Sequence, residues 1–265
     1  MPAVLVLLAA LVFGFGLRAD TVAPRSLTYS GSSIVNAADS LPGPLAPNGI
    51  ATIYGTGLAY TTKAIAPSDI RSGILPIVLP GTGVHVFVSG IAAAIYYVSP
   101  GQINFLVPNI LIAGPSDVQV TLDGVAGPLQ PIQIASTSPA FFQLDAQTVI
   151  ATHVDGTVLT VDQPAISGEL IILYATGLGQ VVPPLGNLQV PSGALRIAQL
   201  ANLKITLDGA LLDPSRVAYA GVAPGFAGLY QINLRLPDFV GPNPEIRLGL
   251  ADDMSPPGLK LPVKP

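Results

Sequence analysis

GQINFLVP, residues 101–108, has the pattern of a β-strand that ends at a proline. Three apolar residues alternate with Gln102, Asn104 and Leu106, as in a strand that buries one face. The same arrangement, YQINLRLP, returns at residues 230–237. A strand pattern that occurs twice, each time closed by proline, predicts two related units in one chain.

Other similar stretches occur in the same order along both halves of the sequence. IATIYGTGLA at 50–59 resembles LIILYATGLG at 170–179, and GVHVFVSG at 83–90 resembles NLKITLDG at 202–209. Each half offers six or seven alternating segments in about 110 residues, which is typical of an immunoglobulin-like sandwich. A single barrel of about sixteen strands is the alternative that this pattern leaves open.

The composition favours many short strands. Half of the residues are hydrophobic, 10% are charged, and 28 Gly and 27 Pro interrupt the apolar runs as turn residues do. We therefore predict an all-β chain of two tandem immunoglobulin-like β-sandwich domains related by internal duplication, at residues 27–139 and 140–265. One short helical turn is expected within residues 66–75.

Residues 1–19 have the features of a secretory signal peptide. The apolar run at 3–16 is too short for a comfortable membrane span, and Ala19 is a plausible cleavage point. Because no Lys or Arg precedes the run, an uncleaved N-terminal anchor is the alternative. The chain has no Cys and hence no disulfide, which mildly favours a bacterial envelope or medium. We predict a bacterial protein that is secreted, extracellular or in the cell envelope.

The charge pattern restricts the class of partner. The net charge is −4 and the Lys and Arg residues form no cluster, so neither nucleic acid nor an anionic membrane surface is expected to bind. An extracellular protein or a polysaccharide is the expected partner, and open sheet edges allow self-association. No membrane contact is expected once the signal peptide is removed.

The repeated carboxamides allow two interpretations. Gln102 and Asn104 in the first half, and Gln231 and Asn233 in the second, lie on the polar side of their strands. They would suit sugar hydroxyls as a ligand platform, or would satisfy buried groups of neighbouring segments. Their presence in both halves favours a structural signature over a single specific site.

The motifs YGTGL and YATGL each contain a glycine that could suggest a phosphate loop. Gly57 and Gly177 are followed neither by a third glycine at the dinucleotide-binding spacing nor by Gly-Lys-Ser/Thr. We expect both glycines to provide a positive φ at a bulge or turn.

The sequence carries no recognisable catalytic motif. His85 is expected on an exposed strand position, and His153 with Asp155 would give too few ligands for a metal. Gly-x-Ser-x-Gly and Ser-x-x-Lys are missing, and the carboxylates are scattered, although two distant acids could still meet as in a glycosidase. We predict no enzyme activity, catalytic residue, metal site or cofactor.

YAGVAPGFAGLY, residues 219–230, is the best candidate for a functional loop. The first half lacks these extra residues, and loops often carry function. Tyr219, Phe226 and Tyr230 are the candidate ligand-binding residues, in a chain without Trp; the alternative is a long turn packed by Phe226. Tyr96 and Tyr97 are adjacent in a strand, so one of them is expected to face the core. We predict a structural or protein-interaction module, or alternatively a glycan- or envelope-binding module that uses this loop.

Two resemblances agree with this prediction. IYGTGLA at 53–59 is similar to the early strand of TIG/IPT-type immunoglobulin-like domains. The stretches from VNAAD at 35–39 to GVAPGFAGLYQINLRLP at 221–237 resemble, in the same order, a family of uncharacterised C-terminal domains of secreted proteins first catalogued in Solibacter and other acidobacteria. The resemblance implies an extracellular module at the end of large secreted or surface proteins, with no established activity.

Overall fold

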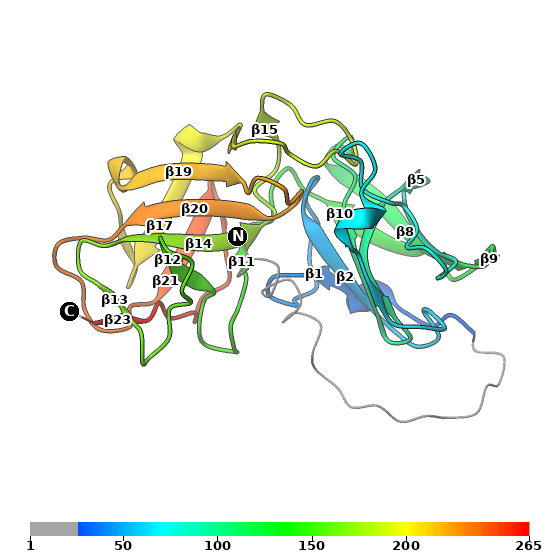
Figure 1. Cartoon of the computed structure of the whole chain (residues 1–265), viewed down its shortest axis with the longest axis horizontal. Helices are drawn as coiled ribbons and strands as arrows, with labels where there is room; N and C mark the ends of the chain where they lie inside the picture. Colours follow the sequence, from blue (N-terminus) through cyan, green and yellow to red (C-terminus); the bar gives the residue numbers. More distant parts are fainter. Residues whose placement is uncertain (1–25, 265) are drawn as a thin grey trace.

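The computed structural model describes residues 26–264, and its regular structure is almost entirely β (Figure 1). The predicted signal peptide lies outside the described residues. Helical structure within them is limited to short 3₁₀ turns, and the turn expected within residues 66–75 is Pro67–Asp69. The other turns are Gly31–Ser33, Leu200–Asn202 and Pro214–Arg216.

The first half of the chain forms two sheets. One has the order β1–β2–β7–β6–β3, and the other has the order β10–β8–β4–β5 with β9 paired to β8. The first contains β1 (Ile34–Asn36), β2 (Ile50–Tyr54), β7 (Gln102–Leu106), β6 (Ala94–Ser99) and β3 (Lys63–Ala64). The second contains β10 (Gln130–Ile134), β8 (Gly114–Leu122), β4 (Val84–Val88), β5 (Ile91–Ala92) and β9 (Val125–Ala126).

The second half repeats this plan with a larger first sheet. That sheet has the order β11–β14–β20–β19–β16–β15, with β12 paired to β14, and the second has the order β18–β17–β21–β22. The first contains β11 (Ala140–Phe141), β14 (Leu170–Thr176), β20 (Tyr230–Arg235), β19 (Val217–Val222), β16 (Leu195–Ile197), β15 (Val181–Val182) and β12 (Ala151–His153). The second contains β18 (Ala210–Leu211), β17 (Leu203–Leu207), β21 (Ile246–Leu250) and β22 (Asp253–Met254), while β13 (Ala165–Ile166) pairs in parallel with β23 (Val263–Lys264).

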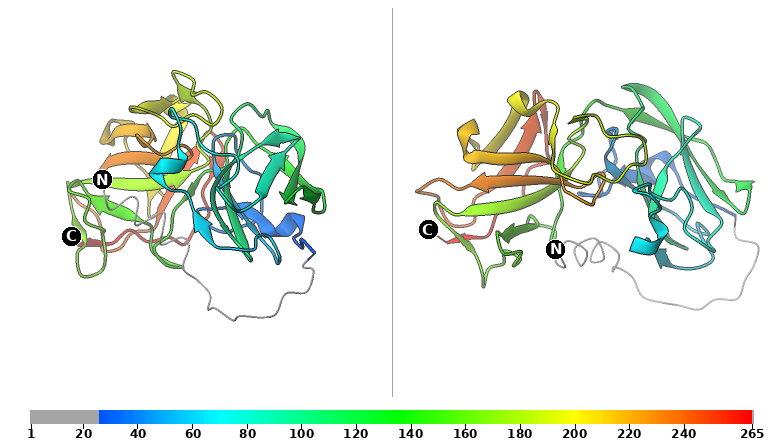
Figure 2. Two further views of the ribbon diagram at one scale, coloured as in Figure 1. Left: turned by 45° about the vertical axis from the view of Figure 1, so that its right-hand side comes forward. Right: turned by 45° about the horizontal axis from the view of Figure 1, so that its top comes forward.

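Each pair of sheets encloses its own apolar core, as the alternating sequences predict. In β4 and in β17 the first, third and fifth residues are buried, while the residues between them keep part of their surface. The core side chains of the first sandwich include Ile53, Ile103, Phe105, Val86 and Val120, and those of the second include Leu173, Ile232, Leu234, Ile205 and Leu248. Two separate cores confirm two tandem β-sandwiches and exclude the single barrel (Figure 2).

The Gln-Ile-Asn strands occupy equivalent central places. β7 lies between β2 and β6, and β20 lies between β14 and β19. Each outer partner, β6 or β19, also carries a register shift next to a tyrosine that pairs with the asparagine: Tyr97 with Asn104, and Tyr219 with Asn233. The shared strand order agrees with the internal duplication, which remains a prediction.

The bulge in β6 corrects the expectation for Tyr96 and Tyr97. Ile95 pairs with Phe105 and faces the core, but the register shift places Tyr97 opposite Asn104, on the other side of the sheet. Tyr96 packs into a separate apolar cluster with Leu106. Neither tyrosine belongs to the core of the first sandwich, because a bulge interrupts the period-two alternation.

Candidate functional site

The loop between β19 and β20, residues 223–229, reaches the first sandwich. Ala223, Ala227 and Leu229 belong to one buried apolar cluster with Ile50 of β2, Tyr96 of β6 and Leu106 of β7. These three residues of the first sandwich lie on the side of their sheet that faces away from its own core. We call this contact the junction: Ile50, Tyr96 and Leu106 against residues 223–229.

Hydrogen bonds reinforce the junction. The Tyr96 hydroxyl donates to the Ala227 carbonyl at 2.7 Å. The Thr176 hydroxyl accepts from the Ile50 backbone N–H at 2.9 Å and donates to the Gly228 carbonyl at 2.8 Å. These buried polar groups are satisfied only while the two sandwiches stay in contact, so the bonds hold one sandwich against the other.

Tyr230 extends the junction to the start of β20. Its side chain is fully buried, and its hydroxyl accepts from Asn48 Nδ2 at 2.9 Å and donates to the Gly179 carbonyl. Asn48 belongs to the first sandwich and Gly179 to the second. Tyr230 therefore bridges the two halves and offers no surface to a ligand in this structure.

The other two loop candidates keep part of their surface. The Tyr219 hydroxyl donates to the Val222 carbonyl at 2.9 Å, and the Arg196 guanidinium lies 5.5 Å from the centre of its ring. Phe226 is partly buried against the junction cluster. The structure thus does not gather Tyr219, Phe226 and Tyr230 on one exposed surface.

A second contact joins the halves further along the same side. The Leu75 N–H donates to the Leu188 carbonyl at 2.8 Å, and the Val190 N–H donates to the Gly73 carbonyl at 2.8 Å. Asn109 Nδ2 donates to the Leu185 carbonyl at 2.6 Å. The sequence analysis missed these residues, although residues 177–195 have no charged side chain and several prolines, a signal that could have indicated a contact region.

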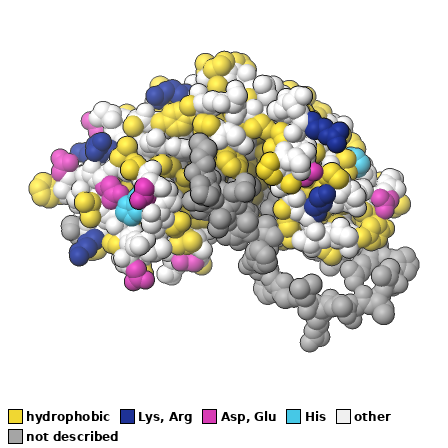
Figure 3. Space-filling view, viewed as in Figure 1, with side chains coloured by type: hydrophobic (Ala, Val, Ile, Leu, Met, Phe, Trp, Pro, Cys, Tyr) yellow, Lys and Arg dark blue, Asp and Glu magenta, His cyan; other side chains and the backbone are white. Residues whose placement is uncertain are grey.

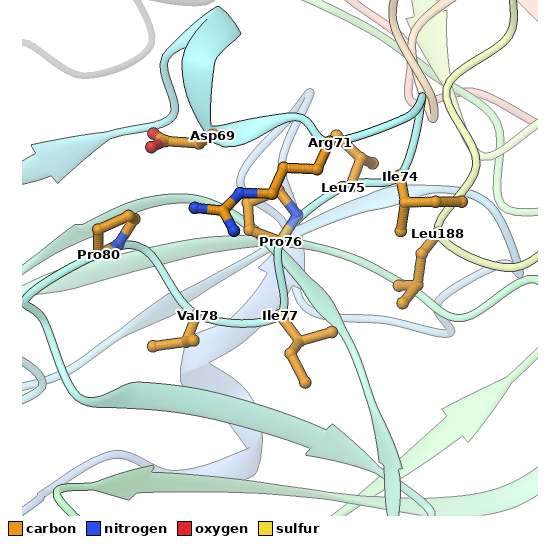
Figure 4. A pocket seen from close by; sticks show the side chains of 9 residues that line it. All are labelled: Asp69, Arg71, Ile74, Leu75, Pro76, Ile77, Val78, Pro80 and Leu188. Carbon is orange, nitrogen blue, oxygen red and sulfur yellow. The ribbon is translucent and has the colours of Figure 1, made fainter.

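A groove with a volume of about 460 Å³ lies beside the second contact (Figure 4). Asp69 and Arg71 lie on one side of it and the chain from Pro76 to Pro80 on the other, with Ile74 and Leu188 at one end. Leu188 comes from the second half of the chain, so both halves line the groove. It is lined by Asp69, Arg71, Ile74, Leu75, Pro76, Ile77, Val78, Pro80 and Leu188.

The Gln-x-Asn pairs make the same internal bond in both sandwiches. Gln102 Nε2 donates to Asn104 Oδ1 at 2.8 Å, and Gln231 Nε2 donates to Asn233 Oδ1 at 2.7 Å. Asn104 also accepts from the Thr52 hydroxyl at 3.0 Å and is more deeply buried than Asn233. This shared bonding supports the structural interpretation of the motif.

We expect Asn104→Ala to lower the free energy of unfolding by about 1–2 kcal/mol, because the Thr52 and Gln102 donors lose a buried acceptor. Asn233→Ala removes one bond at a partly exposed position and should cost about 0.5 kcal/mol. Urea denaturation of both variants measures the difference. Equal, negligible losses would contradict a structural role for Asn104.

The two histidines are engaged at separate places. His85 stacks on Phe87 with ring centroids 6.2 Å apart. His153 does not pair with Asp155: its Nδ1 lies 2.5 Å from Oε1 of Glu169, whose Oε2 accepts from the Ile166 N–H at 2.9 Å. Among residues 26–264, no three His, Asp or Glu side chains are placed to hold a metal ion together.

Charged side chains are sparse on the surface. On the face seen in Figure 3 they are scattered over a mostly apolar or uncharged exterior. In the described part of the chain, no helix is long and apolar enough to cross a membrane.

The junction tyrosines predict instability in alkali. Burial raises the pKa of the Tyr96 and Tyr230 hydroxyls well above the ordinary 10.0, because a phenolate would be desolvated there. Above about pH 10 the unfolded chain releases protons that the folded chain retains, so the free energy of unfolding should fall as the pH rises. Urea denaturation between about pH 8 and 11 measures this slope, and the double variant Tyr96→Phe/Tyr230→Phe should flatten it. An unchanged slope in that variant would contradict the prediction.

Comparison with known proteins gives structural neighbours only. No family model matches the chain, and no curated protein matches its sequence. Surface glycan-binding protein PbSGBP-B from Prevotella bryantii is 11% identical with a TM-score of 0.26, over 88% of this chain and 41% of that chain. SGBP-B of the Bacteroides ovatus mixed-linkage glucan utilization locus is 12% identical with a TM-score of 0.34, over 91% and 46%. Domains 5–6 of the S-layer protein SbsC are 12% identical with a TM-score of 0.25, over 83% and 92%. The chain spans less than half the length of the two glycan-binding proteins.

Proposed function

We propose that this chain is a non-enzymatic, secreted or cell-surface module of a bacterium that binds another protein while its two sandwiches act as one rigid unit. The junction is the observation that carries the proposal. Tandem domains joined only by a linker move relative to each other. Here Tyr96, Thr176 and Tyr230 supply buried hydrogen bonds across the contact, which favours a fixed arrangement.

A fixed arrangement supports an interaction role because surfaces from both halves keep one geometry. A partner that touches both sandwiches then loses less conformational freedom on binding than it would with a flexible pair. The engaged histidines agree with a role other than catalysis, since His85 stacks on Phe87 and His153 bonds Glu169.

The alternative is a glycan- or envelope-binding module that uses residues 219–230. Tyr219 and Phe226 keep part of their surface and remain the candidates for this function. Tyr230 is excluded as a contact residue by its complete burial.

A pull-down separates the two functions. Residues 20–265 are incubated with insoluble polysaccharides, with isolated cell envelopes and with immobilised secreted proteins. Tyr219→Ala and Phe226→Ala are tested beside Tyr60→Ala, which changes a tyrosine that is 66% exposed elsewhere, and circular dichroism verifies folding. Saturable retention by a defined protein, unaffected by the loop variants, supports the proposal. Retention on polysaccharide that only the loop variants abolish would establish the alternative.

A further inference from the structure

The side of the groove formed by residues 76–80 carries free backbone groups. The Pro76 carbonyl accepts from the Ile95 N–H at 2.9 Å, and the Leu79 carbonyl accepts from the Thr82 N–H at 3.1 Å. Between them, Ile77 and Val78 make no hydrogen bond to any residue in 26–264. Extended backbone with open donors and acceptors can pair with another strand.

The opposite side carries a free positive charge. Arg71 is exposed, and its guanidinium has no hydrogen bond or ion pair within the described part of the chain. The neighbouring Asp69 is already engaged, because its Oδ2 accepts from the Ala66 N–H at 2.9 Å. An unpaired arginine beside an apolar surface suits a carboxylate, which it can bind through two N–H groups.

The rest of the lining is apolar and uncharged. Ile74 is 44% exposed, although a side chain of this kind is normally buried, and Leu188 continues the same surface from the second half. The groove near Gly31 and Pro131 has a similar volume but is lined without any charged side chain. Only the groove at Arg71 combines open backbone, apolar surface and charge.

We propose that this groove binds an extended peptide of a partner protein that has alternating apolar side chains and one carboxylate. The peptide backbone pairs with Ile77 and Val78, its apolar side chains contact Ile74 and Leu188, and its carboxylate binds Arg71. This proposal rests on the proposed function and specifies the chemistry of the partner. The occupant is a foreign segment, because a neutral apolar peptide would leave Arg71 without a counter-charge.

Selection from a display library of random ten-residue peptides tests the groove. Against residues 20–265, selected peptides should alternate apolar residues and be enriched in Asp or Glu at one position. Against Arg71→Glu, the enrichment at that position should change to Lys or Arg. Lys264→Glu, an exposed charge reversal elsewhere, should keep the original preference. The same acidic preference with Arg71→Glu, or no enrichment at all, would overturn the proposal.

The backbone contact is tested on a selected peptide. In strand pairing, alternate amides of the peptide face the partner strand. N-methylation of one alternate set should weaken binding at least about tenfold, and methylation of the other set should leave it nearly unchanged. Equal effects of both sets would exclude strand addition at Ile77 and Val78.

Failure of this proposal and failure of the proposed function give different results. A protein partner that binds wild type and Arg71→Glu equally would leave the interaction module standing and remove the groove as its site. Analytical ultracentrifugation covers the other occupant: a dimer of residues 20–265 that Arg71→Glu dissociates would replace the foreign peptide with a second copy of the chain.

Discussion

Replacing Gly177 by alanine should destabilise the protein by about 2–5 kcal/mol. Gly177 has φ +77°, a conformation that residues with a Cβ rarely adopt. An added Cβ would also lie 1.9 Å from the Ser138 carbonyl oxygen, which belongs to the segment linking the sandwiches. Because that neighbour is backbone, the linker itself would have to move. Urea denaturation monitored by circular dichroism measures the loss.

Gly209→Ala is the matched control for this substitution. Gly209 has φ +80°, and an added Cβ there meets no atom within 4 Å. It reports the conformational cost alone, which should be about 1 kcal/mol. Equal losses for both variants would show that contact with the linker contributes nothing at Gly177.

Tyr230→Phe should cost about 2–4 kcal/mol, although it removes a single oxygen atom. The variant leaves Asn48 Nδ2 and the Gly179 carbonyl buried without the partner that each now has. Unpaired buried groups bear the full desolvation penalty, whereas the ring itself still fits. Because Asn48 lies in the other sandwich, the variant should also loosen the coupling between the halves and broaden the unfolding transition.

Tyr60→Phe controls for the loss of a hydroxyl group. Tyr60 is 66% exposed, so its variant should stay within about 0.5 kcal/mol of wild type. If Tyr230→Phe behaved in the same way, the hydroxyl bridge would have no role in holding the sandwiches together. The rigid unit on which the proposed function depends would then lose its main support.

Local sequence was sufficient to predict the sandwiches. The alternation in GVHVFVSG and NLKITLDG gives β4 and β17, because side chains of a strand point to opposite faces in turn. Gly57 and Gly177 have positive φ values of 68° and 77°, as expected from their places after a strand. The bulge that moves Tyr97 to the outer face has no comparable local signal, so the alternation rule gave the wrong face there.

The sequence by itself thus determined the strand pattern, the two separate cores and the glycine turns, since these depend on residues close together in the chain. Only the tertiary structure decided the roles of residues 219–230 and Arg71. Tyr230 looks like a loop aromatic until Asn48 is placed against it, and Arg71 lines a groove only because Leu188 closes one end. These contacts join residues distant in sequence, and their partners follow from how one sandwich packs on the other, which no local periodicity encodes.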